Sequence, residues 1–184
     1  MKDEIFTVWR DAARAVADGA VKELNDTYEL TPAQRLRADV LMRQYTCDRV
    51  CGHLWCAEGI DKDEGHDIGD SIRDELIREA LAGPVSREGK GFSLFLYRSG
   101  RRVYRDGCFR ALFDELLGPE CPIGPGGRDS LSDGLMEIID KRIKALEKRR
   151  TKERREREHP YDGPPMWMDE FEYIDWLISG GDDD

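Results

Sequence analysis

Residues 31–56, TPAQRLRADVLMRQYTCDRVCGHLWC, begin with a complete set of helix-start signals. Thr31 can cap a helix, Pro32 suits the first helical position, and Gln34 can reach back to close a capping box. Apolar residues then recur at steps that place them on one side of a helix: Leu36, Val40, Cys47, Cys51 and Leu54. We therefore predict a helix from about Pro32 to about Cys56.

The stretch before this helix has the same period. Its apolar residues follow one another at three- and four-residue steps: Ile5, Trp9, Ala12, Ala13, Val16, Ala20 and Leu24. This pattern predicts an amphipathic helix over residues 3–24. A turn at residues 25–30 would join the two helices into an antiparallel hairpin.

Residues 57–70, AEGIDKDEGHDIGD, are rich in glycine and acidic residues, and we expect a loop there. The loop begins like a calcium-binding loop at Asp61 and Asp63. However, His66 occupies the position that calcium loops reserve for glycine, and Ile72 occupies the position of the closing glutamate. A solvated acidic loop is therefore favoured over a cation site. The next helix is expected to start at Ser71 and to end before Gly83-Pro84.

Residues 92–105 carry the β-strand signal of the chain. Aromatic and apolar residues at 92–97, a Ser-Gly turn and a return strand predict a β-hairpin. Four arginines cluster about its turn: Arg98, Arg101, Arg102 and Arg105. Guanidinium groups bind phosphates, and neighbouring aromatic rings stack on bases, so the cluster is a candidate nucleic-acid or phosphate contact. Alternatively, the aromatic side chains form the buried face and the arginines pair with nearby acids.

Two more helices are predicted after the hairpin. The first runs from Asp106 to Gly118, and a Gly- and Pro-rich connector at residues 118–129 follows it. The second starts at Ser130 and buries a stripe that ends at Leu146. No apolar residue occurs from 147 to 159, so we expect this end of the helix to be solvated. Residues 141–157 contain ten Lys/Arg and three Glu, a net charge of 10 − 3 = +7.

The C-terminal residues 159–184 reverse this charge, with eight Asp/Glu and no Lys or Arg. We predict a short acidic amphipathic helix there. Its candidate partner-binding residues are the apolar stripe and the acids beside it: Trp167, Phe171, Ile174, Ile178, Asp169, Glu170, Glu172 and Asp175. Such a helix suits a groove, either on the chain itself or on a partner protein.

A group of cysteine and histidine residues is a weak metal candidate: Cys47, Cys51, His53 and Cys56. On one helix Cys56 lies about 180° from Cys47, at 100° per residue, which separates the ligands. We therefore favour core cysteines and expect no cofactor. Five cysteines without a disulfide pattern indicate reduced thiols and a cytoplasmic protein.

The predicted architecture is mainly α with one small β-hairpin, an α+β fold. A helical domain at 1–146 is followed by a basic extension and acidic tail at 147–184. No apolar run is long enough to span a bilayer. Charged residues make up 37% of the chain and the net charge is −10, which disfavours long-range attraction of nucleic acid.

No enzymatic motif is recognised, and we expect a non-enzymatic protein that binds another protein through charge-patterned surfaces. A small phage- or plasmid-type inhibitor of a nucleic-acid-handling host defence complex, acting by nucleic-acid mimicry, fits this pattern. Two alternatives stay open: direct nucleic-acid binding through the basic hairpin and the basic helix end, and a small metal-dependent enzyme. The oligomeric state does not follow from the sequence.

Overall fold

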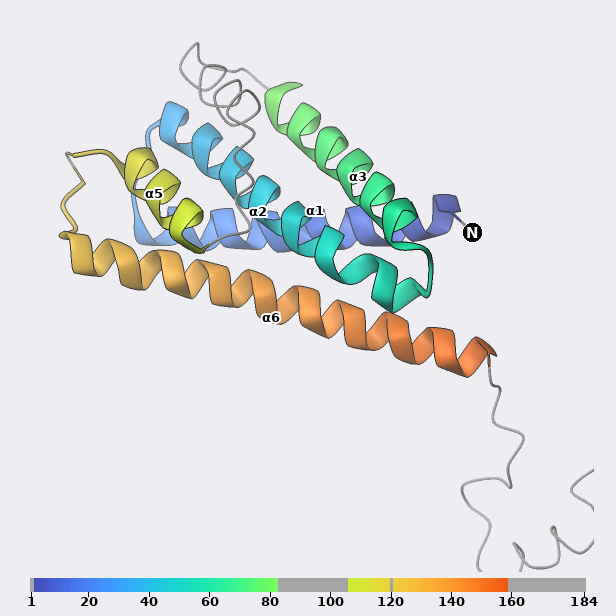
Figure 1. The fold of residues 1–184 in the computed structure, drawn as a ribbon. Helices are drawn as coiled ribbons and strands as arrows, with labels where there is room; N and C mark the ends of the chain where they lie inside the picture. Colours follow the sequence, from blue (N-terminus) through green and yellow to red (C-terminus); the bar gives the residue numbers. More distant parts are fainter. Residues whose placement is uncertain (1, 83–105, 120, 159–184) are drawn as a thin grey trace, which may run out of the picture. The chain divides into compact units, whose positions relative to one another are not determined.

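The computed structural model describes residues 2–82, 106–119 and 121–158. Five helices account for most of them (Figure 1): α1 (Lys2–Thr27), α2 (Pro32–Glu58), α3 (Lys62–Ala82), α5 (Asp106–Leu117) and α6 (Pro125–Glu158). The chain divides into two compact units, Met1–Thr151 and Lys152–Asp184. The contacts of α2 with α1, α3 and α5 lie within the first unit.

The predicted α+β fold is wrong for the part of the chain that the structure describes, which is helical and contains no strand. The apolar residues of this part recur at helical steps, and none of its segments alternates as a strand does. Residues 92–105, where we predict the hairpin, lie outside the described residues.

The predicted N-terminal helical hairpin is confirmed by α1 and α2. The Thr31 hydroxyl accepts a hydrogen bond from the Gln34 backbone N–H, and the Gln34 side chain accepts one from the Thr31 N–H at 3.0 Å. Gly59 ends α2 in the left-handed conformation (φ 67°), where glycine avoids the strain that a side chain would meet.

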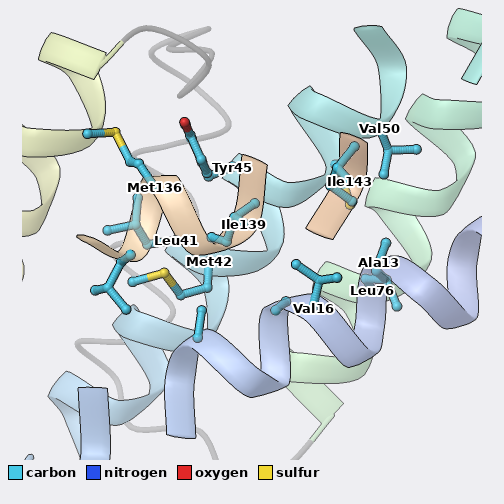
Figure 2. Close-up of a cluster of buried hydrophobic side chains, with 14 of the residues drawn as sticks. Ala13, Val16, Leu41, Met42, Tyr45, Val50, Leu76, Met136, Ile139 and Ile143 are labelled. Carbon is cyan, nitrogen blue, oxygen red and sulfur yellow. The ribbon is translucent and has the colours of Figure 1, made fainter. Parts of the chain in front are cut away.

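Helix α2 is the element on which the core is built. Residues 41–47 are all buried, so no side of this stretch faces solvent. Helices α1, α3 and α5 each pack against α2 (Figure 1). Side chains of α6 reach α2 through the Arg49–Asp140 and Glu58–Arg150 pairs. Figure 2 shows Leu41, Met42 and Tyr45 of α2 among apolar side chains from α1, α3 and α6.

The acidic loop predicted at 57–70 is largely helical, because α3 begins at Lys62 and not at Ser71. The Asp61 carboxylate accepts a hydrogen bond from the Asp63 N–H at 2.8 Å and caps the helix. Gly65 and Gly69, which suggest a loop in the sequence, face α2. A Cβ on Gly65 would lie 2.5 Å from the Cβ of Trp55, and one on Gly69 would collide with the Cys51 sulfur. These glycines serve close helix packing.

Helix α5 ends as predicted, with Gly118 in the left-handed conformation (φ 69°). Helix α6 begins at Pro125, five residues before the predicted start at Ser130. The Arg128 side chain donates hydrogen bonds to the carbonyl oxygens of Ile123 (3.0 Å) and Gly118 (2.9 Å). The Arg128 side chain therefore satisfies two backbone carbonyl groups of the connector that joins α5 to α6.

The expectation that nothing after Leu146 is buried is wrong at Arg150, which is 7% exposed. Its guanidinium makes two hydrogen bonds to Glu58, from Nε at 2.7 Å and from Nη2 at 3.0 Å. The Trp9 Nε1 donates to the same carboxylate at 2.7 Å. A charged side chain can be buried where it is paired, which a hydrophobic pattern does not register.

Among the described helices, none is both long and apolar enough to cross a membrane.

Candidate interaction surfaces

The glycines of α2 and α3 differ in their surroundings. Gly65 and Gly69 are buried against α2, whereas Gly52 is exposed and none of the described atoms lies within 4 Å of the Cβ position that it lacks. A glycine inside a helix destabilises it by about 1 kcal/mol relative to alanine. Close packing accounts for Gly65 and Gly69 but not for Gly52.

Gly52 borders a groove of about 290 Å³ between α2 and α3. Asp48 lies on its α2 side, and His66 and Asp70 lie on its α3 side. Two basic side chains of the groove are directed toward α6. Arg49 Nε lies 2.8 Å from an Asp140 oxygen, and His53 Nδ1 lies 2.9 Å from a Glu147 oxygen. Asp48, which accepts a hydrogen bond from Gln44 at 3.2 Å, and Asp70, which pairs with Arg73 at 2.8 Å, form the acidic part of the rim of this groove.

The outer side of α3, opposite the glycine seam, carries an acidic row: Asp63, Asp67, Asp70 and Asp74. These residues are spaced by four, three and four, so they share one face over about 16 Å of helix. Asp63, Asp67 and Asp74 are exposed. Arg73 pairs with Asp70 at 2.8 Å and lies 3.6 Å from Asp74, and the Lys2 ammonium is close enough to Asp67 for their charges to attract.

On its other flank α3 is joined to α1 by ion pairs. Arg14 makes two hydrogen bonds to Glu79, at 3.0 and 2.6 Å, and Arg10 bonds Glu75 at 3.2 Å. The hydrogen bonds from Arg14 lower the pKa of Glu79 below its usual value. This flank of α3 is therefore held to α1 by direct ion pairs.

Arg43 lies where α1, α2 and α3 meet. Its Nε donates to Asp39 at 2.7 Å and its Nη2 to Asp18 at 3.0 Å. Burial nevertheless raises the pKa of Asp39, because desolvation of its carboxylate outweighs the attraction of Arg43. We assign this cluster a structural role, since its charged groups pair with one another and hold the three helices together.

The residues of the predicted cysteine and histidine group are separated in the structure. Cys47 and Cys51 are buried in α2, and burial raises the pKa of the Cys47 thiol, which disfavours a reactive thiolate. Cys56 is exposed, and His53 faces Glu147 of α6. Within residues 2–82, 106–119 and 121–158, no group of three or more His, Cys, Asp or Glu is arranged to hold a metal ion.

Two predicted sites lie outside the described residues. These are the arginine cluster of the hairpin (Arg98, Arg101, Arg102 and Arg105) and the tail at 159–184 with its stripe (Trp167, Phe171, Ile174 and Ile178) and acids (Asp169, Glu170, Glu172 and Asp175). Both stay predictions from the sequence.

Two features were not found by sequence reasoning. The acidic row of α3 was hidden because Asp63, Asp67 and Asp70 were assigned to a loop and only Asp74 to the helix after it, although their spacing of four, three and four is itself a helical signal. The groove over Gly52 has no sequence signature beyond a glycine inside a helical pattern.

No protein-family model, no curated protein and no solved structure matches this chain.

Proposed function

We propose that the protein is a non-enzymatic binding protein whose acidic α3 face and adjoining groove hold a basic segment of a partner protein. The main support for this proposal is Gly52, an exposed mid-helix glycine beside a groove with an acidic rim. Its lack of a side chain leaves room for a partner side chain between Asp48 and Asp70. A lysine or arginine there would complement both carboxylates.

The acidic row extends this surface along α3. Four carboxylates occupy about 16 Å of one helix face, and one strand of DNA presents about five phosphates over the same axial length, at 3.4 Å each. The position of the row is fixed, because Gly65 and Gly69 allow α3 to pack directly against α2. This comparable number of negative charges over the same length supports a partner whose basic groove normally holds nucleic acid, which the protein would occupy and inhibit.

The tail at 159–184 would add a second acidic element to the same function, as its sequence predicts. Truncation before Trp167 would then weaken the complex without altering the α3 face.

A capture experiment tests the proposal. The full-length protein is used as bait in a nuclease-treated lysate of its source organism, and retained proteins are then challenged with a 20-base-pair DNA duplex. We expect a retained basic protein that the duplex displaces. Retention should be lost for the bait Asp63→Asn/Asp67→Asn/Asp74→Asn. The control Glu23→Gln/Asp26→Asn/Glu29→Gln loses the same charge at exposed positions away from α3 and should retain it.

A second pair of baits tests the groove. Gly52→Gln fills it, and Gly134→Gln makes the same change on α6, where the missing Cβ also has no neighbour among the described atoms. Both should raise the free energy of unfolding by about 0.5 kcal/mol, because glutamine is the better helix former. Only Gly52→Gln should release the partner. Equal retention by both baits, or a complex that the duplex leaves intact, would overturn the proposal.

A further inference from the structure

A second surface lies away from the acidic face, where α2, α5 and α6 border a depression of about 710 Å³. Three lysines of α6 line it at steps of three and four: Lys141, Lys144 and Lys148. All three are exposed. Met136 and Ala145 add apolar surface between the charges.

The carboxylates of this depression are mostly engaged by arginines. Asp133 accepts two hydrogen bonds from Arg110, at 2.8 and 2.9 Å. Asp140 pairs with Arg49 at 2.8 Å and accepts a hydrogen bond from the Tyr45 hydroxyl at 3.3 Å. In the described part of the chain, no carboxylate lies within 4.0 Å of the ammonium group of Lys141, Lys144 or Lys148.

This arrangement differs from a solvated helix surface. Glu137 precedes Lys141 by four residues and Asp140 precedes Lys144 by four, the order that favours ion pairs within a helix. Neither pair is formed, since Arg49 engages Asp140 and Glu137 lies outside ion-pair distance of Lys141. The lysine charges are therefore available to an external anion.

We propose that Lys141, Lys144 and Lys148 form a binding strip for the phosphates of single-stranded nucleic acid. The strip is about 10 Å long along the helix axis, so its three ammonium groups can contact a few successive phosphates. A flexible single strand can follow a short strip into a depression, whereas a duplex is a stiff rod. A flat phospholipid surface would bring its phosphates against Glu137 and Asp133 as well as against the lysines.

The inference is independent of the proposed protein-binding function, because the strip and the acidic row are on different helices. With a net charge of −10, the protein repels polyanions at long range, so binding should be short-ranged and strongly dependent on salt. Three phosphate contacts predict a slope of about −2 in a plot of log K against log salt concentration.

The test is fluorescence anisotropy of a labelled twelve-nucleotide oligo(dT) with the full-length protein at low salt. The variant Lys141→Gln/Lys144→Gln/Lys148→Gln should bind about tenfold or more weakly and show a flatter salt dependence. The control Lys22→Gln/Lys62→Gln/Arg78→Gln removes the same charge at exposed positions on α1 and α3. Its affinity for the oligonucleotide should stay within about twofold of the wild-type affinity. Thermal unfolding of each variant separates loss of binding from loss of fold.

One variant should increase affinity. Glu137→Gln removes the carboxylate that faces the same depression, and we expect about twofold to fivefold tighter oligonucleotide binding. The proposal is overturned by any of three results. These are no binding of the oligonucleotide at low salt, equal loss of binding in the control variant, or preferential binding of vesicles that contain anionic phospholipid.

Discussion

Helix α2 packs against α3 and against α6 in two different ways. At the α3 seam the backbones approach closely, because Gly65 and Gly69 have no side chain to hold Trp55 and Cys51 away. At the α6 seam long side chains bridge the helices, and the Glu58–Arg150 pair is the most deeply buried of them. The α2–α3 contact depends on the absence of side chains at two glycines, and the α2–α6 contact depends on paired charges.

The α6 seam also has a regular apolar spacing. Its buried residues repeat at steps of three and four, as in the seam of a coiled coil: Met136, Ile139, Ile143, Leu146 and Arg150. Arg150 occupies the last of these positions and therefore points at the core, where Glu58 meets it (Figures 1 and 2 show the helix and the apolar part of the seam). The two seams should respond to different kinds of substitution.

The largest effect is expected at the charge pair. Glu58→Gln removes the negative charge that pairs with the Arg150 guanidinium, a side chain that is 8% exposed. We expect a loss of about 3–5 kcal/mol in the free energy of unfolding, as for other buried pairs from which one partner is removed. Chemical denaturation measures it.

Two controls define the cause of this loss. Glu58→Leu combined with Arg150→Met should recover most of the stability, because neither charge is then buried. Glu147→Gln affects the half-buried His53 pair and should cost less than about 1 kcal/mol. If the double variant is as unstable as Glu58→Gln, the seam depends on the hydrogen bond that Trp9 donates to Glu58 and not on charge pairing.

The glycine seam should show a smaller effect with a distinctive coupling. Gly69→Ala places a Cβ against the Cys51 sulfur, and we expect it to destabilise the protein by about 1–3 kcal/mol despite the better helix propensity of alanine. Cys51→Ala in the same chain should relieve the collision, so the two substitutions should be strongly non-additive in denaturation experiments. Additive effects would mean that α3 can move away from α2 at no cost.

The same comparison shows what the sequence could and could not predict. The capping box of Thr31 and Gln34, the stripe of α1 and the glycine that ends α5 are local signals, and the structure confirms them. The start of α3 was misplaced because Gly65 and Gly69 favour loops on their own. Their role in close packing depends on α2, which lies outside the short stretch of sequence from which α3 is predicted.

The burial of Arg150 escaped prediction for a related reason. Hydrophobic spacing assigns a basic residue to solvent, and its partner Glu58 is far away in the chain. The surfaces proposed for function could be predicted from the sequence only in part. The lysine spacing of α6 is visible in the sequence, but the engagement of Asp133 and Asp140 by Arg110 and Arg49 requires the fold.

The smallest effect concerns the ion pairs between α1 and α3, which are exposed and should add little to the glycine seam. Glu79 accepts two hydrogen bonds from Arg14, which lower its pKa below the ordinary value of 4.5. A carboxylate with a lowered pKa stabilises the folded state above its unfolded pKa and loses that contribution as the pH falls through the folded value. Glu79→Gln should therefore reduce the free energy of unfolding by less than about 1 kcal/mol at pH 7, since Glu79 is partly exposed. The difference from wild type should be complete above the ordinary pKa of 4.5 and should shrink as the pH falls through the lowered pKa of Glu79. A difference that does not shrink as the pH falls below 4.5 would show that Glu79 acts through packing, and the α1–α3 contact would then resemble the glycine seam more than the charged one.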